Sequence, residues 1–240
     1  MIDFKGGEKY EITPIDKLTT ADFLKRYHYL SKSGFSFRSG HNFGLFHDDE
    51  LAGVAVFHTV SAWETVKGCF GWAKDDQKNC GVYELGRLAM SPDGYTENLT
   101  SWFLARAMKL LRKTCKVRAI LSYADSDYHV GYIYQSLNFN YYGLTTPKKD
   151  FWVINSDGSE KKLSRGKPSM YVGEWRERSR KHRYLIVYDK TLKPKWEKQD
   201  YPKGDNALPN NGGTTPVKTT SSQTGGDANE VQPETSPSHC

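Results

Sequence analysis

The chain has 240 residues, of which 37% are hydrophobic and 26% are charged, and its formal net charge is +6 at pH 7. This composition fits one globular domain with extensions, and no run approaches the roughly 20 apolar residues that span a bilayer. The four cysteines show no C-x-x-C spacing, which favours reduced thiols over a zinc site or a disulfide framework.

The end of the chain differs from the rest in composition. Residues 201–240 are rich in Gly, Pro, Ser, Thr and Asn, which predicts a disordered tail. This tail carries two lysines and four acidic residues, so residues 1–200 hold a net charge of +8. We expect residues 1–200 to form one domain with a basic extension at about 161–200. A basic domain favours a polyanionic partner, nucleic acid first, with ordinary solvated charge as the alternative.

The first part of the chain predicts a strand, a helix and a hairpin. Residues 9–13 form the strand. Thr19 or Thr20 can cap a helix that ends near residue 30, because a Thr hydroxyl accepts from an otherwise unpaired N–H. The run HNFGLFHDDELAGVAVFHTV at 41–60 predicts two strands joined by a DDE turn.

The middle of the chain predicts a β-α-β unit. Residues 63–79 suggest a long loop, and residues 82–92 suggest a strand that a Ser-Pro-Asp-Gly turn ends. Asn98 can cap a helix of about sixteen residues. Residues 117–123 then form a strand that is apolar enough to be central. A unit of this kind crosses over with a right hand and makes its two strands parallel.

The last part of the domain predicts a second helix and further strands. Ser126 or Asp127 can cap the helix, and strands follow at residues 141–145 and 182–188, with a hairpin at 151–161. The order of elements resembles the GNAT acetyltransferase fold. The expected fold class is therefore α/β, a GNAT-like mixed central sheet with two splayed parallel strands, flanked by helices. By position, the splayed strands would be residues 82–90 and 117–123.

The run ELGRLAM places two charged residues within a central strand. Strict alternation puts Glu84 and Arg87 on opposite faces of that strand. Charges there are costly unless they are paired or solvated. If the strand borders a cleft, Glu84 can serve as a general base and Arg87 can hold an anion. The alternative is a structural ion pair.

The run SYAD ends the next strand in polar groups. Ser122 and Asp125 would stand at the carboxyl end of the sheet, where open α/β sheets bind their ligands. Ser122 could hold a substrate or act as a nucleophile. The alternative, capping of the following helix, suits Asp127 better than Ser122. Tyr134 on that helix is a candidate general acid, with core packing as its alternative.

A basic run with interleaved aromatic residues lies between residues 161 and 183. Positive charge neutralises phosphates, and aromatic rings stack on exposed bases, so the run predicts a nucleic-acid contact. A solvated surface is the alternative. The candidate contacts are Lys167, Arg176, Arg178, Arg180, Lys181 and Arg183.

Four motifs together resemble the bacteriophage Mom family. They are RYHYL at 26–30, ELGRLAM at 84–90, YADSDYHVGYIYQSLNFNYYG at 123–143 and RKHRYL at 180–185. Mom proteins are GNAT-like DNA-modification enzymes that convert adenine N6 to a carbamoylmethyl derivative and so block restriction. The resemblance implies a GNAT-like catalytic domain, a DNA partner and action in the host cytoplasm.

The resemblance also implies roles for individual residues. His28 and Tyr29 would lie near the reacting centre, Ser122 and Asp125 would hold the adenine or the donor, and Arg87 would support the cleft. Adenine N6 is stacked and paired inside a duplex, so double-stranded DNA would have to present the base flipped out.

The donor is left open by the sequence. The pyrophosphate pattern of GNAT enzymes, R/Q-x-x-G-x-G/A, is missing from SPDGYTENLT at 91–100, which puts acetyl-CoA in doubt although an acyl-type donor remains possible. Asn98 and Ser101 could still offer a helix N-terminus to a cofactor. His28, His129 and Asp125 could bind a metal but show no diagnostic spacing.

Two other functions compete with DNA modification. One is a GNAT acyltransferase that uses a CoA donor on a small amine or peptide and binds CoA tightly. The other is a DNA-binding protein without catalytic activity, for which His28, Ser122 and Asp125 would be dispensable. The product, the sequence context of the adenine and the oligomeric state are not determined by the sequence.

Overall fold

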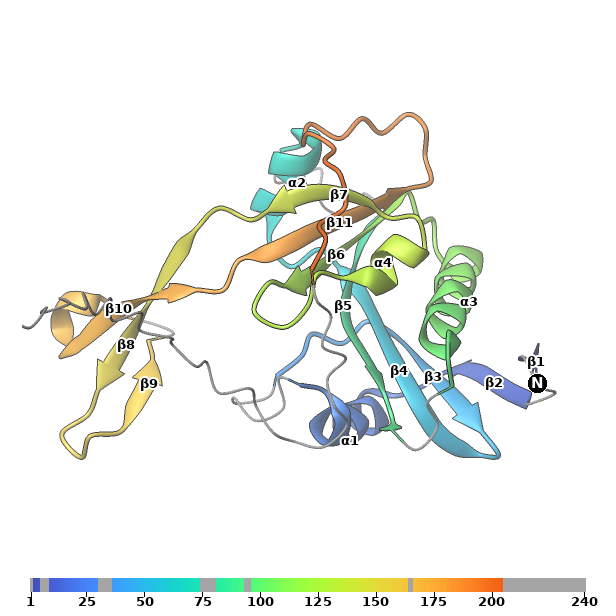
Figure 1. Cartoon of the computed structure of the whole chain (residues 1–240), viewed down its shortest axis with the longest axis horizontal. Coiled ribbons are helices and arrows are strands. Elements are labelled where there is room, and N and C mark those ends of the chain that lie inside the picture. Colours follow the sequence, from blue (N-terminus) through green and yellow to red (C-terminus); the bar gives the residue numbers. More distant parts are fainter. Residues whose placement is uncertain are drawn as a thin grey trace, which may run out of the picture. The chain divides into compact units, whose positions relative to one another are not determined.

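The structure is a computed structural model that describes residues 2–4, 9–29, 36–73, 81–92, 96–163 and 166–204. A mixed sheet of eight strands forms its centre, in the order β1-β2-β3-β4-β5-β6-β11-β7 (Figure 1). The strands are β1 (Ile2–Asp3), β2 (Lys9–Pro14), β3 (His41–His47), β4 (Glu50–Thr59), β5 (Val82–Met90), β6 (Ala119–Asp125), β7 (Asn140–Leu144) and β11 (Lys181–Val187). In this sheet β5 and β6 pair in parallel, and the other neighbours pair antiparallel.

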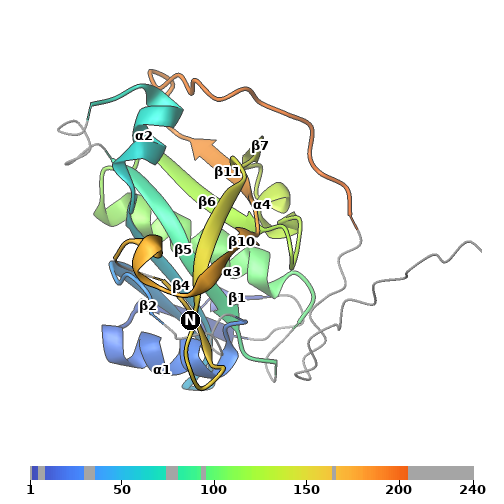
Figure 2. The ribbon, with the colours of Figure 1, turned by 90° about the vertical axis from the view of Figure 1, so that its left-hand side faces the viewer.

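Helices cover both faces of the sheet (Figures 1 and 2). They are α1 (Lys17–Tyr27) and α2 (Trp63–Phe70) on one face, and α3 (Leu99–Thr114) and α4 (Tyr132–Ser136) on the other. Successive side chains of β4 point to opposite faces of the sheet and are apolar on both. Val54 and Val56 pack with α1, and Ala55 and Phe57 pack with α3. The prediction of a GNAT-like mixed sheet flanked by helices is confirmed.

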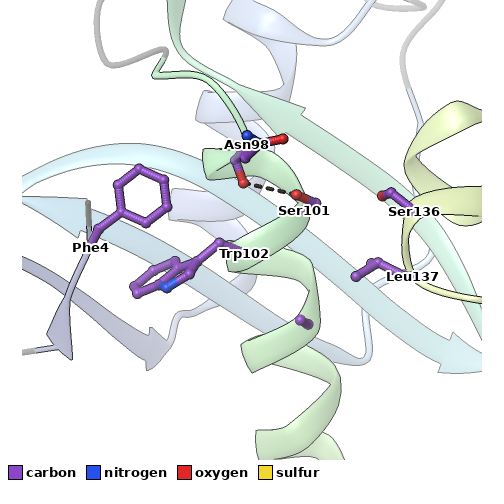
Figure 3. A pocket seen from close by; sticks show the side chains of 7 residues that line it. Phe4, Asn98, Ser101, Trp102, Ser136 and Leu137 are labelled. Atoms are coloured by element: carbon purple, nitrogen blue, oxygen red, sulfur yellow. Dashed lines mark hydrogen bonds between the residues drawn. The ribbon is translucent and has the colours of Figure 1, made fainter.

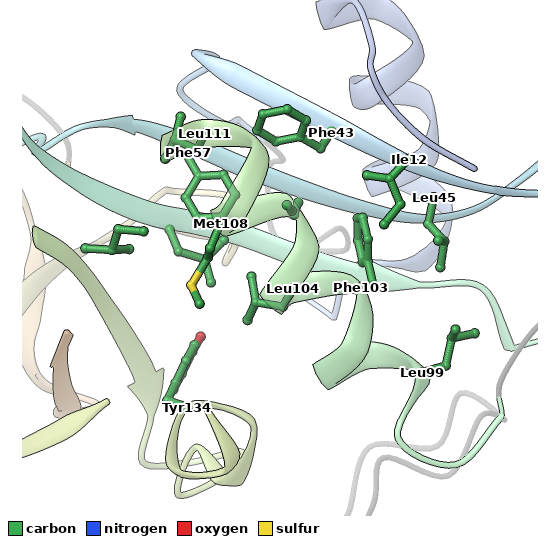
Figure 4. Close-up of a cluster of buried hydrophobic side chains, with 14 of the residues drawn as sticks. Ile12, Phe43, Leu45, Phe57, Leu99, Phe103, Leu104, Met108, Leu111 and Tyr134 are labelled. Atoms are coloured by element: carbon green, nitrogen blue, oxygen red, sulfur yellow. The ribbon is translucent and has the colours of Figure 1, made fainter. Parts of the chain in front are cut away.

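The main core lies between α3 and the sheet (Figure 4). Phe103, Leu104 and Leu111 on α3 are fully buried there, together with Phe57 of β4. Each large apolar side chain of this kind stabilises the fold by about 1.5–3 kcal/mol when it is buried. This packing holds α3 against β2, β3 and β4.

The two parallel strands separate partway along their length. The pairing runs from Val82 with Ala119 to Leu85 with Ser122 and then stops. The rest of β5 and of β6 continues on opposite sides of a gap. The predicted splay of these two strands is therefore present, and it opens at the carboxyl end of the pair.

A β-bulge lies at the same level. The pairing of β4 with β5 shifts register between Val56 and Phe57, so that β5 contributes one extra residue at Gly86. As a result, Leu85 and Leu88 both pack into the core under α3. The prediction that Glu84 and Arg87 lie on opposite faces was wrong, because the bulge shifts the alternation between them.

Gly86 also marks a close approach of two strands. A Cβ atom at this position would lie 2.3 Å from Nε2 of His58 on β4. The His58 ring is buried, and its Nδ1 donates to the Thr59 carbonyl at 2.9 Å, so the ring is held in place. Glycine is therefore required at the bulge, where any side chain would collide with the imidazole.

The cap of α1 differs from the predicted one. Asp16, not Thr19 or Thr20, is the N-cap, and its carboxylate accepts from the N–H groups of Leu18 at 2.7 Å and Thr19 at 3.0 Å. Both N–H groups donate to Oδ1 of this carboxylate, so one side chain satisfies two of the unpaired N–H groups at the helix start. The helix ends at Tyr27, so His28 lies just beyond its last turn.

Two further elements were predicted wrongly. Residues 63–70 form α2 and not a loop, because Val66, Cys69 and Phe70 supply an apolar helical face; residues 74–80 lie outside the described part. The helix after β6 begins after Gly131 and not at Ser126 or Asp127. Main-chain bonds within the 125–129 turn delay its start.

A second sheet of three strands is inserted between β7 and β11 (Figure 1). Its order is β10-β8-β9, with β8 (Lys148–Ile154), β9 (Glu160–Lys162) and β10 (Gly173–Arg178). The sequence predicted the hairpin of β8 and β9 but missed β10. A short 3-10 helix (Pro168–Met170) precedes β10. Of the predicted disordered tail, residues 201–204 are described, and the Tyr201 hydroxyl donates to the Phe139 carbonyl at 2.8 Å. Residues 205–240 lie outside the described part.

Candidate active site

The site is built at the open end of the splay, beginning with the residues that follow α1. His28 is 5% exposed, and its backbone N–H donates to the Leu24 carbonyl at 3.0 Å, which fixes it at the helix end. The ring of Tyr29 stacks on the His28 ring, with centroids 4.6 Å apart and planes 23° apart. The chain thus presents an imidazole and a phenol side by side.

The surroundings of His28 keep its ring neutral. Burial lowers the pKa of His28 to about 4, and the charges of Arg87 and His129 act in the same direction. At neutral pH the imidazole therefore has one nitrogen with a lone pair that can accept a hydrogen bond or a proton. A buried His whose pKa is shifted by its surroundings is a candidate catalytic residue.

Arg87 presents an unused donor near His28. Its Nη1 donates to the Gly86 carbonyl at 2.6 Å, and its Nη2 donates to the Ser36 carbonyl at 3.1 Å. Its Nε is buried and makes no hydrogen bond to any described group. A buried donor without a partner is costly, and an anionic or carbonyl oxygen is the acceptor that would satisfy it.

Asp125 closes β6 with a buried carboxylate. It is 5% exposed, and it accepts from Lys181 of β11 and from the N–H of Asp127 at 3.1 Å. Its carbonyl accepts from the N–H groups of Tyr128 and His129, each at 3.0 Å. The carboxylate is therefore fixed by an ion pair on one side and by a tight turn on the other.

Two exposed tyrosines meet at this end of the sheet. Tyr29 is 44% exposed and Tyr128 is 52% exposed, and their ring centroids lie 4.8 Å apart. The edge of His129 faces Tyr29 at 6.2 Å. Exposed aromatic rings beside a buried His and a buried Asp form a surface on which a planar ligand can stack.

Ser122 and Tyr134 lie on the other face of the sheet at the point of separation. Ser122 is fully buried, and its hydroxyl donates to the Leu85 carbonyl at 3.0 Å, across the last paired residues of β5 and β6. Burial raises the pKa of Tyr134, while a hydrogen bond with Ser122 lowers it. Both hydroxyls therefore lie at the base of the gap.

Glu84 is not brought to the open end of the splay. It lies within the paired part of β5, beside Leu121 of β6. Its carboxylate accepts from the backbone N–H of Ser61 at 3.2 Å. Glu84 therefore lies where β5 and β6 are still paired, and the role of general base predicted for it stays a prediction.

A groove of about 540 Å³ lies between the start of α3 and α4 (Figure 3). Asn98 precedes α3 in a left-handed conformation, with φ of 67°, and its side chain makes no capping hydrogen bond within the described part. The Ser101 hydroxyl donates to the Asn98 carbonyl at 2.9 Å. The groove is lined by Phe4, Asn98, Ser101, Trp102, Ala105, Ser136 and Leu137.

The predicted nucleic-acid contacts have partners inside the chain. Arg176 pairs with Glu160 and Glu174, Arg178 pairs with Asp150, and Lys181 pairs with Asp125. Arg180 donates to the Thr145 carbonyl, and Arg183 lies over the Trp196 ring. Lys167 is exposed, without an ion pair among the described residues. The sequence missed Glu160, Asp150 and Asp125 as partners because they lie on neighbouring strands, whereas Glu174 lies on β10 itself.

Three residues near the site had other roles, or none, in the sequence analysis. Tyr128 was not singled out, His129 was named only as a possible metal ligand, and Lys181 was predicted only as a DNA contact; Tyr128 and His129 follow the Asp125 turn. The motif that carries Asp125 also contains Tyr128 and His129, so their closeness could have been expected. No sequence signal links Asp125 with Lys181, because strand register brings them together.

The described residues offer no group of three or more His, Cys, Asp or Glu side chains that could hold a metal ion. No described helix is long and apolar enough to cross a membrane. These two findings concern only the part of the chain that the structure describes.

Similar solved structures are acetyltransferases. The ribosomal-protein-S18-alanine N-acetyltransferase from Escherichia coli is 14% identical, with a TM-score of 0.44, over 75% of this chain and 95% of that one. An acetyltransferase from Bacillus subtilis in complex with CoA is 13% identical, with a TM-score of 0.42, over 75% and 98%. A GNAT family acetyltransferase from Streptococcus pneumoniae is 11% identical, with a TM-score of 0.45, over 75% and 99%.

No curated protein matches the chain. The model of the Mom protein family matches residues 9–203, which is most of the chain and includes His28, Arg87, Ser122 and Asp125. The predicted resemblance is therefore confirmed, and the chain belongs to the Mom protein family of phage DNA-modification transferases.

Proposed function

We propose that this protein transfers a carbamoylmethyl-type group to N6 of adenine in DNA and thereby protects the DNA from restriction. The observation that carries the proposal is a grouping at the open end of the β5–β6 splay. It consists of a neutral His28, an Arg87 Nε without a hydrogen-bond partner among the described residues, and a fixed Asp125 carboxylate. Membership of the Mom family supports DNA as the substrate.

The two tyrosines are proposed to receive the adenine. The N6 amino group is stacked and paired in a duplex, so the base must leave the helix at a cost of a few kcal/mol. Stacking on an aromatic ring returns about 1–3 kcal/mol per base. Tyr29 and Tyr128 are in contact with each other, so the base either stacks on the outer face of the pair or displaces Tyr128.

His28 is proposed to take the proton that N6 loses. The bond between N6 and the donor carbon forms as the bond from that carbon to its leaving group breaks, and the N6 proton passes to the imidazole. N6 carries a positive charge once it has bonded to the donor carbon, and this cationic nitrogen is strongly acidic, so a base whose pKa is lowered to about 4 is sufficient to take its proton. Asp125 lies near the same side chains and is proposed to hold the amino group or the ring nitrogen beside it.

Arg87 and the α3 groove are proposed to hold the donor. The Nε of Arg87, which has no hydrogen-bond partner in the described part of the chain, suits a carbonyl or carboxylate oxygen of the transferred group. Asn98 and Ser101 lie at the start of α3, where backbone N–H groups favour a negatively charged end of a ligand. Ser122 and Tyr134 are proposed to fix the width of the splay from its closed end.

Restriction of plasmid DNA tests the proposal. A plasmid grown in cells that express the full chain is expected to resist endonucleases whose sites contain adenine, and to stay sensitive to those whose sites lack it. With His28→Ala the plasmid is expected to be cut by both. Equal protection by His28→Ala would instead support a DNA-binding protein without catalytic activity.

A second candidate function is a GNAT acyltransferase with a CoA donor. The groove at the start of α3 favours it, because an anionic donor could bind there. This candidate predicts tight binding of CoA in calorimetry and an acylated small amine or peptide as the product. DNA modification predicts that the activity depends on DNA and persists without an added acyl acceptor.

A further inference from the structure

The three-stranded sheet of β8, β9 and β10 is held together by ion pairs on one face. Asp150 of β8 accepts from Lys162 of β9 at 2.6 Å and from Arg178 of β10 at 3.0 Å. Arg176 of β10 donates to Glu160 of β9 through both terminal nitrogens, at 2.6 and 2.7 Å. The charged side chains of this face are therefore largely paired with one another within the sheet.

The opposite face carries an exposed aromatic ring and two lysines, together with the buried Phe151 and Val153 of β8. Strand register places Trp175 opposite Phe151, and it places Lys149 and Lys161 on the same face. Trp175 is 57% exposed and meets the buried Phe151 edge-to-face at 5.4 Å, which holds the indole in position. Glu177 is the acidic residue of this face, opposite Lys149.

The two lysines of this face keep their charge available. Both are exposed, and neither takes part in a salt bridge within the described residues. Residues 148–180 contain nine Lys or Arg residues against five Asp or Glu residues, a net charge of +4. An exposed indole beside unpaired ammonium groups is the combination that binds a nucleic-acid strand, because it offers both stacking and phosphate contacts.

The sheet is also connected directly to the proposed active site. β10 leads through Ser179 and Arg180 into Lys181, whose ammonium donates to Asp125 and to the Ser179 hydroxyl. Arg180 and the N–H of Lys181 bond to Thr145, which follows β7. DNA held by the sheet would therefore be held by the same chain segment that supplies a residue to the site.

We propose that the three-stranded sheet is a DNA-docking arm, in which the face of Trp175, Lys149 and Lys161 lies against the DNA next to the target base. The proposal rests on the proposed function, since it takes DNA as the substrate. It differs from the expectation from sequence, which placed the contacts on Arg176 and Arg178. Self-association through this face would bring its lysines against one another, so a second copy of the chain is disfavoured.

The test is the affinity of the full-length protein for a fluorescently labelled, adenine-containing duplex, measured by anisotropy over a series of salt concentrations. Lys149→Gln with Lys161→Gln is expected to reduce the salt slope of log K by about 1.8, because each phosphate contact contributes about 0.9. Trp175→Ala is expected to weaken binding by about tenfold, and Trp175→Tyr to restore most of it.

Matched controls separate the arm from general charge. Lys109→Gln with Lys113→Gln removes the same charge from exposed positions on α3 and is expected to leave the salt slope unchanged. Lys148→Gln changes an exposed lysine on the opposite face of β8 and is also expected to have little effect. Thermal melting verifies that each variant is folded.

The outcomes distinguish this inference from the proposed function. An unchanged salt slope in the Lys149/Lys161 variant overturns the docking arm, even if DNA is still modified. A change in sedimentation coefficient with unchanged DNA affinity also overturns it, because the face would then join two copies. If the arm variants lose DNA affinity but no deoxyadenosine is modified by the wild-type chain, the arm stands and the proposed chemistry fails.

Discussion

Lys181 and Asp125 are direct register partners on β11 and β6, and the Lys181 ammonium donates to the Asp125 carboxylate. Asp125 is nearly inaccessible to water, whereas about a third of the Lys181 side chain is exposed. The pair lets β6 end in a carboxylate inside the protein. It also links the strand that leaves the three-stranded sheet with the residue at the centre of the proposed site.

Removal of Lys181 should leave a buried charge without its partner. Lys181→Met is expected to reduce the free energy of unfolding by about 1–3 kcal/mol, measured by urea denaturation at pH 7. The double variant with Asp125→Asn should recover part of that loss, because the unpaired carboxylate is then absent. The exposed Lys193→Met is the control. Equal losses in the single and double variants would refute this explanation.

His28 should make the protein sensitive to acid. Its pKa is about 4 in the folded chain, below the ordinary value of 6.5, so the unfolded chain binds the proton more strongly. The free energy of unfolding is therefore unaffected by His28 protonation above pH 6.5. It decreases as the pH falls from 6.5 towards 4, by up to about 3 kcal/mol. His28→Gln should flatten this part of the stability profile, and His47→Gln on the half-exposed end of β3 should not. An unchanged slope in His28→Gln would show that the effect lies elsewhere.

The bulge at Gly86 should tolerate no side chain. Gly86→Ala would push a methyl group against Nε2 of His58, and the expected loss of stability is about 1–3 kcal/mol, with lower modification of DNA. Gly86→Ala combined with His58→Ala removes the collision and should regain stability in thermal melting. A stable Gly86→Ala protein with normal activity would contradict the importance of this close approach.

A large side chain at position 105 should fill the groove at the start of α3 and exclude the donor. Ala105 lines it, and Ala105→Trp is expected to reduce DNA modification about tenfold or more while the affinity for DNA is unchanged. Ala105→Ser is the matched control. Full activity of Ala105→Trp would mean that the donor binds elsewhere. A parallel loss of DNA affinity would mean that the groove belongs to the DNA surface.

The sequence predicted the fold well where its patterns are local. The apolar run at 117–123 corresponds to β6, and the helix after Asn98 corresponds to α3. Together they predicted that β6 pairs in parallel with β5. It was wrong on the faces of Glu84 and Arg87, because a bulge depends on the pairing of β4 with β5 and leaves no mark in one strand. It also missed α2, whose apolar face is short.

The candidate site was predicted only in part for a similar reason. His28, Arg87, Ser122 and Asp125 gather around the splay, since each stands next to an element that the patterns located. The partners of the basic run could not be predicted, because Asp150 and Glu160 reach Arg178 and Arg176 only across strands. Charge along the sequence therefore did not reveal which arginines are paired within the chain.

The central claim is that this chain modifies adenine, and the mass of the nucleosides tests it most directly. Plasmid DNA from cells that express the wild-type chain or His28→Gln would be digested to nucleosides and analysed by mass spectrometry. The account predicts a deoxyadenosine species heavier by a carbamoylmethyl substituent, present with the wild-type chain and absent with His28→Gln. Only the four ordinary nucleosides, from cells that hold folded wild-type protein, would contradict it.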